Sequence, residues 1–250
     1  MSKTALVSII TPCYQAARYL PGLLASVQAQ QYPHWELWLV DDGSSDGTAA
    51  AIAEAAAADS RIHALFLPEN QGAAAARNAG ISAARGRYIA FLDVDDRWMP
   101  EKLQRQLDFM QRENIAFSYT YYKVVEENGR AAGVVDQLPA KLSYEQLLTR
   151  NFVGCLTAMY DSAQLGKVLM PALRKRQDYG LWLHLLKKTP YAYLLPEVLA
   201  TYTRRESSLS SNKLGLIRYN WQLFRQVEGL SLLSACYYLS CNITAKLFSL

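Results

Sequence analysis

The chain has 250 residues, of which 51% are apolar, and a net charge of +4, so it can bury the core of one large domain or of a domain with an added subdomain. This composition excludes a disordered chain, and four cysteines without paired spacing argue against a zinc ribbon or a disulfide framework. Residues 1–11 are too short an apolar segment for a signal peptide or a membrane span, so the expected location is cytoplasmic.

The charge is unevenly distributed along the chain. Residues 1–150 contain 14 Lys and Arg against 17 Asp and Glu, whereas residues 151–250 contain 12 against 5. The second part therefore has a net charge of +7 and is expected to face an anionic partner. Nucleic acid, a phosphate-bearing substrate and an acidic membrane surface all meet that description.

Apolar segments alternate with helical segments through the first 112 residues. The predicted strands are 6–10, 36–40, 62–67 and 88–92, and the predicted helices are 18–30, one that ends at 58, 73–84 and 100–112. The first strand is expected to stop at Pro12, because proline has no N–H to give the sheet. Strands without polar alternation, separated by helices of this length, indicate a parallel sheet covered on both faces.

Two acidic clusters directly follow the second and fourth predicted strands. Asp41 and Asp42 follow one strand, and Asp93, Asp95 and Asp96 follow the other. In a parallel sheet both clusters lie at the carboxyl edge, which is where ligands bind. Because clustered carboxylates repel unless they are neutralised, a divalent cation with a phosphorylated ligand is the first hypothesis.

Two other polar residues have simple structural interpretations. Asp46 precedes a predicted helix and is interpreted as its cap. Arg77 lies in the small-residue segment 72–80 and would suit a phosphate or a base carbonyl. From the residues alone, a solvated arginine on a packed alanine helix is the simpler interpretation.

The second half is harder to interpret. It contains a predicted hairpin, with strands 115–125 and 131–135, and a predicted helix, 177–188. Asp178 lies near the start of that helix on the same face as buried-type residues three, four and seven positions later. From the residues alone a helix cap is favoured for Asp178 over a catalytic base, and the isolated His184 is interpreted as structural.

The tail contains a segment, 229–245, without any charged residue. It reaches the lower length limit of a membrane span but has too many Ser, Asn and Thr side chains for one. Docking on the body or a homodimer contact is favoured, and peripheral attachment to an anionic membrane surface is the alternative.

Five motifs in a fixed order give the sequence a specific resemblance. They are Val7-Ser8-Ile9-Ile10-Thr11-Pro12-Cys13-Tyr14, the segment 32–48 with Val40-Asp41-Asp42-Gly43-Ser44, Ala76-Arg77-Asn78-Ala79-Gly80, Phe91-Leu92-Asp93-Val94-Asp95-Asp96, and Arg176-Gln177-Asp178-Tyr179-Gly180-Leu181-Trp182. In this order they resemble the family 2 glycosyltransferases, the inverting, sugar-nucleotide-dependent enzymes of the GT-A fold. One departure is Gln15, where the family usually has Asn.

The resemblance implies an α/β fold with a Rossmann-like, mostly parallel sheet, helices on both faces and a helical C-terminal extension. Residues 1–112 would bind the nucleotide-sugar donor, 113–210 would form the acceptor-binding and catalytic-base half of the same GT-A domain, and 211–250 would be the helical tail.

It also implies where the nucleoside lies. Thr11, Pro12 and Tyr14 would line the base, while Asp41 and Asp42 would hold the base and the ribose.

The same resemblance assigns the phosphate and metal contacts. Arg77 would contact the base or the diphosphate, Asp93 would face the ribose, and Asp95 would ligate the metal. Arg204 and Arg205 would be phosphate partners in a loop that can close over the diphosphate, with a solvated basic loop as the equal alternative.

The implied activity is transfer of a sugar from a nucleotide donor, expected to be UDP-linked, to a hydroxyl of a growing surface glycan or lipid-linked saccharide. Mn²⁺ or Mg²⁺ is the expected cofactor, Asp178 becomes the general base, and nucleic acid is not an expected partner. The alternatives are a non-catalytic sugar-nucleotide binder and a receiver-like signalling domain, which would be a shorter chain with a Lys at a later strand end.

Overall fold

The computed structural model describes residues 5–205 and 213–247. The strands are β1 Val7–Cys13, β2 Trp35–Asp41, β3 Ile62–Phe66, β4 Tyr88–Phe91, β5 Arg97–Trp98, β6 Phe117–Glu126, β7 Ala131–Val135, β8 Lys141–Leu142, β9 Met159–Asp161 and β10 Ala192–Arg204. The helices are α1 Leu20–Gln28, α2 Thr48–Ala58, α3 Ala73–Ala83, α4 Lys102–Arg112, α5 Tyr144–Thr149, α6 Ser162–Leu165, α7 Gln177–Leu186, α8 Lys213–Gln222 and α9 Leu232–Leu247, with a 3₁₀ turn η1 Cys155–Thr157 and a π-helix η2 Leu223–Val227.

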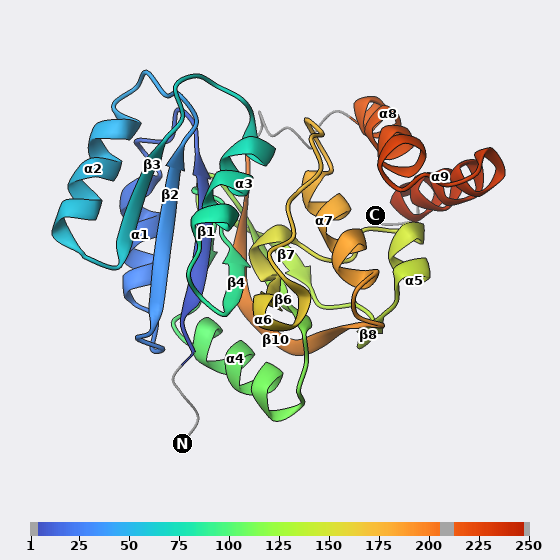
Figure 1. Ribbon diagram of the computed structural model, residues 1–250, viewed down its shortest axis with the longest axis horizontal. Coiled ribbons are helices and arrows are strands. Elements are labelled where there is room, and N and C mark those ends of the chain that lie inside the picture. The colour runs from blue at the N-terminus through green and yellow to red at the C-terminus, as the bar shows by residue number, and fades with distance from the viewer. Residues whose placement is uncertain (1–4, 206–212, 248–250) are drawn as a thin grey trace.

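All the strands within these ranges belong to one mixed sheet with helices on both faces (Figure 1). Its order is β3-β2-β1-β4-β9-β6-β10-β5, with β7 beside β6 and β8 beside β10. The strands β3, β2, β1 and β4 are parallel, as predicted. The short β9 pairs antiparallel with both β4 and β6, and β10 is parallel to β6. The carboxyl ends of β1, β2, β4, β6 and β10 therefore lie at one edge of the sheet.

Alternate side chains of β1 enter two separate cores. Val7 and Ile9 pack with α1, α2 and α4 on one face, and Ile10 packs with α3 and α7 on the other. The small residues of α3 permit this approach, because a Cβ added at Gly80 would lie 2.7 Å from the Ile10 Cγ2 atom. The predicted two-faced packing is confirmed, and it fixes the strand ends on which the site is built.

The expected end of the first strand at Pro12 is wrong. β1 continues through Pro12, which pairs with Val40 of β2, and ends at Cys13. The pairing of β1 with β4 stops at Ile10, so Pro12 has only one neighbouring strand. A proline is tolerated there because the open side of the strand needs no donor.

The tail docks on the body, as the sequence favoured. Phe224 of η2 lies with its ring centroid 6.2 Å from that of Tyr179 in α7, and Ala235 of α9 is fully buried. The Asn242 amide donates to the Leu148 carbonyl oxygen at 2.8 Å, joining α9 to α5. Figure 1 shows α8 and α9 stacked against the side of the molecule formed by α5 and α7. In the described residues, every helix is too short or too polar to cross a bilayer.

The Glu228 carboxylate, which directly follows η2, holds the tail to α7. Its side chain is fully buried and accepts from the Tyr144 hydroxyl at 2.5 Å and from Lys187 Nζ at 2.7 Å. His184 Nε2 lies 3.4 Å from the other carboxylate oxygen, which agrees with the structural role predicted for His184.

Candidate active site

Two adjoining cavities, each of about 350 Å³, open at the carboxyl edge of the sheet. The first cavity is lined by Pro12, Cys13, Tyr14, Asp42 and Val94. The second cavity is lined by Tyr122, Cys155, Arg176, Gln177, Asp178 and Tyr202, among others. Both cavities share one wall, formed by Ala73, Arg77, Asp93, Asp95 and Arg205.

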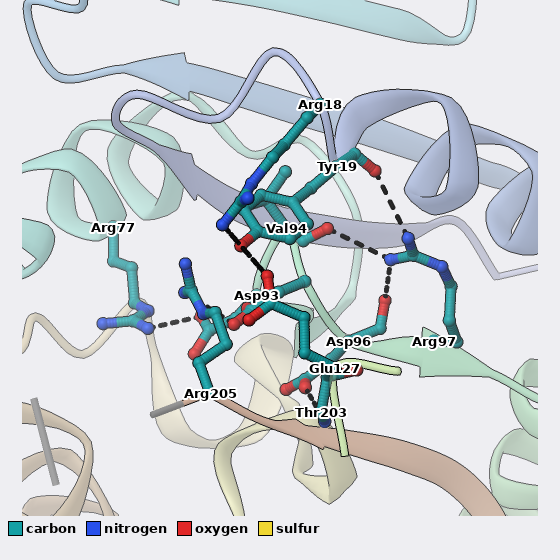
Figure 2. Close-up of polar contacts among 11 residues, drawn as sticks. Arg18, Tyr19, Arg77, Asp93, Val94, Asp96, Arg97, Glu127, Thr203 and Arg205 are labelled. Atoms are coloured by element: carbon teal, nitrogen blue, oxygen red, sulfur yellow. Dashed lines mark hydrogen bonds and ion pairs between the residues drawn. The ribbon is translucent and has the colours of Figure 1, made fainter. Parts of the chain in front are cut away.

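The shared wall contains two ion pairs. Arg77 donates from Nη2 to the Asp93 carboxylate, and Arg205 Nη2 lies 2.5 Å from Asp95 Oδ2. Figure 2 shows Arg77 and Asp93 pointing toward each other, with Arg205 beside them. Arg77 is only 5% exposed, and although burial opposes its charge, Asp93 raises the pKa of the guanidinium above its ordinary value. Both cavities therefore border two fixed cations and two carboxylates.

A polar rim extends from this wall across the loop that precedes α1. Arg18 Nη2 and the Tyr19 hydroxyl lie 3.0 and 2.9 Å from the Glu127 Oε1 atom, which belongs to the β6–β7 turn (Figure 2). The Arg205 guanidinium carbon lies 4.9 Å from the Tyr19 ring centroid. These contacts join the loop before α1 to the β6–β7 turn on one side and to Arg205 on the other.

The acidic residues after β4 have two roles. Asp93 and Asp95 line both cavities, whereas Asp96 lines the second cavity and also bonds to the backbone of β10. Burial and the neighbouring Asp93 raise the pKa of Asp95, with Arg205 acting in the opposite direction. Burial, Asp95 and Asp93 raise the pKa of Asp96 well above its ordinary value. The Asp96 Oδ1 atom accepts from the Thr203 backbone N–H at 2.9 Å, so Asp96 joins this loop to β10.

The donor atoms of the wall fit a hard divalent cation that is completed by its ligand. Asp93 and Asp95 present carboxylate oxygens, the preferred ligands of Mg²⁺ and Mn²⁺, to both cavities. The described residues contain no group of three or more His, Cys, Asp or Glu side chains arranged to hold a metal. A cation here would therefore complete its shell with phosphate oxygens and water, as Mg²⁺ commonly does.

The residues expected to hold the nucleoside do not all reach the first cavity. Pro12 and Tyr14 line it, and Tyr14 is 51% exposed. Asp42 also lines it, but its two oxygens accept from the backbone N–H groups of Gln71 and Gly72, both at 2.8 Å. Asp42 therefore orders the loop that precedes α3.

Thr11 and Asp41 are buried behind the first cavity and line neither cavity. Asp41 Oδ2 accepts from the Ser44 N–H at 3.2 Å, while Asp41 Oδ1 and Thr11 Oγ1 have no hydrogen-bond partner in the described structure.

The Gln15 backbone, at φ +50°, is left-handed, a conformation that Asn adopts more readily than Gln.

Asp178 opens into the second cavity from the first turn of α7. The residue at the cap position is Arg176, with φ +69°, so Asp178 is not the helix cap. The expected inward face is confirmed by Leu181, Trp182 and Leu185, which are fully buried. The helix therefore fixes a half-buried carboxylate in the cavity without using it as a cap.

Several buried polar atoms around the second cavity lack a partner in the described structure. They are Arg77 Nε, Arg176 Nε and Gln177 Oε1. A buried donor or acceptor without a partner lowers the free energy of unfolding, so these atoms indicate that a polar ligand binds in this cavity.

The two predicted phosphate partners lie in different places. Arg205 is part of the shared wall, whereas Arg204 is exposed, pairs with Glu126 in the β10–β6 register and lines neither cavity. The interpretation of Asp46 as the helix cap is wrong, because the cap position of α2 is Gly47; Asp46 precedes it and accepts from the Thr48 N–H at 3.1 Å.

Several residues of the second cavity carried no functional prediction, among them Tyr122, Cys155, Arg176 and Tyr202. Arg176 belongs to the same motif as Asp178, so its position in the sequence could have predicted that it lies in the site. Burial raises the pKa of the Cys155 thiol well above its ordinary value, so this side chain lines the cavity as a neutral thiol. The rings of Tyr122 and Tyr202 meet edge to face at 6.4 Å, across strands whose pairing the sequence did not indicate.

Comparison with known proteins identifies the family. Residues 8–160, more than half of the chain, match the family described as Glycosyl transferase family 2. The putative teichuronic acid biosynthesis glycosyltransferase TuaG of Bacillus subtilis (strain 168) is 43% identical over 232 residues, which cover 93% of this chain and 92% of that protein. The UDP-Glc:alpha-D-GlcNAc-diphosphoundecaprenol beta-1,3-glucosyltransferase WfgD of Escherichia coli is 38% identical over 219 residues, or 87% and 85% of the two chains.

Solved structures show the same fold. S. aureus TarS 1-349 in complex with UDP-GlcNAc matches with a TM-score of 0.74 at 21% identity, covering 93% of this chain and 70% of that one. The mannosyltransferase PcManGT from Pyrobaculum calidifontis, in complex with GDP-Man and Mn²⁺, matches with a TM-score of 0.71 at 17% identity, covering 95% and 70%. The chain therefore belongs to glycosyl transferase family 2 and is a glycosyltransferase of GT-A fold.

Proposed function

We propose that this chain transfers a sugar, with inversion, from a UDP-sugar to a hydroxyl of a lipid-linked saccharide or growing surface glycan. The observation that carries the proposal is the shared wall of Arg77, Asp93, Asp95 and Arg205, which separates one cavity from a second that contains Asp178. Two relatives support the substrate classes: the name of WfgD specifies a UDP-glucose donor and a diphosphoundecaprenol-linked acceptor, and TuaG is named for teichuronic acid biosynthesis.

In this proposal the donor occupies the first cavity. The nucleoside lies against Pro12 and Tyr14, and the diphosphate extends to the shared wall, where Arg77 and Arg205 bind its oxygens. Mn²⁺ or Mg²⁺, held by Asp95 with Asp93 beside it, would neutralise the negative charge that develops on the departing diphosphate.

The acceptor enters the second cavity. Asp178 accepts the proton of the attacking hydroxyl while that oxygen bonds to the anomeric carbon. The bond from that carbon to the diphosphate breaks on the opposite face, so the configuration inverts. Arg176 and Gln177 offer their unpartnered polar atoms to the acceptor or to the sugar being transferred.

The test is nucleoside diphosphate release from a panel of nucleotide sugars with Mn²⁺, with and without candidate acceptors. Asp178→Asn should lower turnover by roughly 10² to 10⁴-fold, the usual contribution of a general base, and leave UDP binding with Mn²⁺ unchanged. Asp136→Asn, at an exposed position outside both cavities, is the matched control.

Two results would contradict the proposal. If Asp178→Asn transferred the sugar at the wild-type rate, Asp178 would not be the general base. Binding of UDP with metal but no product with any acceptor would make the chain a non-catalytic sugar-nucleotide binder.

A further inference from the structure

A groove of about 460 Å³ lies between the end of α5 and α9, outside both cavities. It is lined by Thr149, Arg150, Phe152, Cys241, Thr244 and Ala245. The Thr149 hydroxyl donates to the Gln146 carbonyl oxygen at 2.7 Å, and the Thr244 hydroxyl donates to the Ser240 carbonyl oxygen at 3.0 Å. Because both hydroxyls are already satisfied by the backbone, the groove offers mainly carbon and sulfur surface to an occupant.

The groove continues as an apolar stripe along α9. Leu233, Tyr237 and Cys241 recur every four residues and so lie on one face of the helix. Leu233 is 84% exposed and Tyr237 is 60% exposed, and the Tyr237 hydroxyl is hydrogen-bonded to the Cys241 side chain. A long, flexible apolar chain could therefore follow this face beyond the groove.

A short segment connects the groove with the second cavity. Arg150 and Phe152 line the groove, and Gly154 and Cys155, a few residues later, line the second cavity. A Cβ added at Gly154 would lie 3.2 Å from the ring of Tyr122, which lines the same cavity. The segment 150–155 therefore leads from the groove to the second cavity.

Among the described residues that line the groove, Arg150 is the one cation. Its guanidinium carbon lies 5.4 Å from the Phe152 ring centroid, and it is close enough to Tyr122 to act on that hydroxyl electrostatically. An anion held between the second cavity and the groove would face this guanidinium. From the second cavity outward, the features are thus the proposed base Asp178, the cation Arg150 and the apolar groove.

We infer that this groove binds the polyprenyl chain of a lipid diphosphate acceptor, with Arg150 against the diphosphate and the sugar in the second cavity. A sugar diphosphate on a polyprenyl chain has the same order of chemistry: a hydroxyl to be activated, an anionic linker and a long hydrocarbon. This inference rests on the proposed function and adds to it the site of the lipid.

The test compares two acceptors that differ only in their hydrocarbon, GlcNAc diphosphate as its farnesyl ester and as its methyl ester. The wild type should have a kcat/KM at least about tenfold higher for the farnesyl ester, since burying two or three carbons suffices for that factor. Ala245→Trp fills the groove and should bring the ratio close to one. The matched control is Ala53→Trp, at an exposed position of α2, which should keep the wild-type ratio.

A binding measurement separates this inference from the proposed function. Calorimetry should show that the wild type binds farnesyl diphosphate more tightly than inorganic diphosphate, that Ala245→Trp binds the two equally, and that Arg150→Gln weakens farnesyl diphosphate binding. If neither ester is a substrate but this pattern holds, the proposed function fails and the groove assignment stands.

Three outcomes would overturn the inference. The first is an unchanged ester ratio in Ala245→Trp. The second is an equal loss of activity on both esters, which would make the groove only structural. The third is a wild-type dimer in light scattering that Ala245→Trp converts to a monomer, which would assign the groove to a second copy of the chain.

Discussion

Arg205 and Asp95 form an ion pair at 2.5 Å that joins the end of β10 to the loop after β4. The pair holds one of the two carboxylates proposed for the cation, so Arg205 and a metal compete for Asp95 in the absence of donor. When donor is bound, the diphosphate gives Arg205 another anionic partner. Metal and nucleotide are therefore expected to bind cooperatively.

Replacement of Arg205 tests this competition. Arg205→Gln should tighten binding of Mn²⁺ alone, because Asp95 loses its cation, and should weaken UDP binding with Mn²⁺ by roughly tenfold or more, the value of a charge-assisted hydrogen bond. Calorimetry with and without UDP measures both effects. Arg204→Gln removes the same charge at an adjacent exposed position and should change neither; equal effects of the two substitutions would contradict the role of Arg205.

Glu228 is predicted to stabilise the docked tail in a pH-dependent way. Burial raises the pKa of this carboxyl, but bonds from His184, Lys187 and Tyr144 outweigh that effect, and its pKa falls below the ordinary value of 4.5. A depressed carboxyl pKa gives stability that is present above the unfolded pKa and is lost as the pH falls through the folded pKa. Glu228→Gln should therefore lower the melting temperature at pH 7, and the difference from wild type should shrink below about pH 4.5.

The control for Glu228 is a half-exposed carboxylate with an exposed cationic partner. Glu126 pairs with Arg130 at 2.7 Å on the β6–β7 hairpin, where solvent screens the interaction. Glu126→Gln should leave the melting temperature nearly unchanged at both pH values. A loss as large as that in Glu228→Gln would show that burial of Glu228 is not the cause.

Gly86 is expected to tolerate no side chain. An added Cβ would lie 2.7 Å from both the Leu6 carbonyl oxygen and the Ser8 nitrogen, which are backbone atoms and cannot rotate away. Gly86→Ala should lower the free energy of unfolding by about 3 kcal/mol, the upper end of the usual cost of overpacking, because the backbone atoms cannot move aside. Gly129→Ala, at φ +84° with open space around it, should cost about 1 kcal/mol of backbone strain. Urea unfolding of both variants measures the difference, and equal losses would contradict the steric argument.

Lys102 is a buried cation whose removal should stabilise the protein. It is fully buried over the Trp98 ring, with Nζ 3.8 Å from the centroid and without a hydrogen-bond partner in the described structure. Burial lowers its pKa well below the ordinary value, so the folded state binds fewer protons and the free energy of unfolding falls as the pH drops below the unfolded pKa.

Lys102→Met should therefore raise the free energy of unfolding by about 1 kcal/mol or more at pH 7, since it removes an unsatisfied buried donor at similar volume. The gain should be smaller at pH 10, where less proton binding is lost on folding. The exposed Lys123→Met is the control and should change little at either pH. A loss of stability in Lys102→Met would show that the cation is better solvated than its surroundings indicate.

The parallel half of the fold could be predicted because its strands are buried on both faces and recur between helices. β5, β8 and β9 have only two or three residues each, too few to show a periodicity. β10 is long, but Pro196 interrupts it and the pairing with β6 shifts register on both sides of Val198. A proline within an apolar segment indicates an interruption, so the strand that leads to Arg205 was not predicted.

The candidate site could be predicted only as far as its motifs extend. Pro12, Tyr14, Asp95 and Asp178 were named from the sequence, and they line the cavities. The use of Asp42 as a backbone acceptor depends on a loop geometry that no residue pattern encodes. The ion pairs of the shared wall likewise join segments that only the folded sheet brings together.

The two cavities meet at one wall, but the residues that belong to each alone come from different stretches of the chain. Those of the first cavity lie before residue 95, and those of the second cavity are Asp96 and residues of β6, β10 and the segment 154–178. A substitution in 154–178 can thus reshape one cavity while the other keeps its form. In the proposed function, specificity for donor and acceptor can therefore diverge independently, so that related chains with the same donor can differ in the acceptor that they glycosylate.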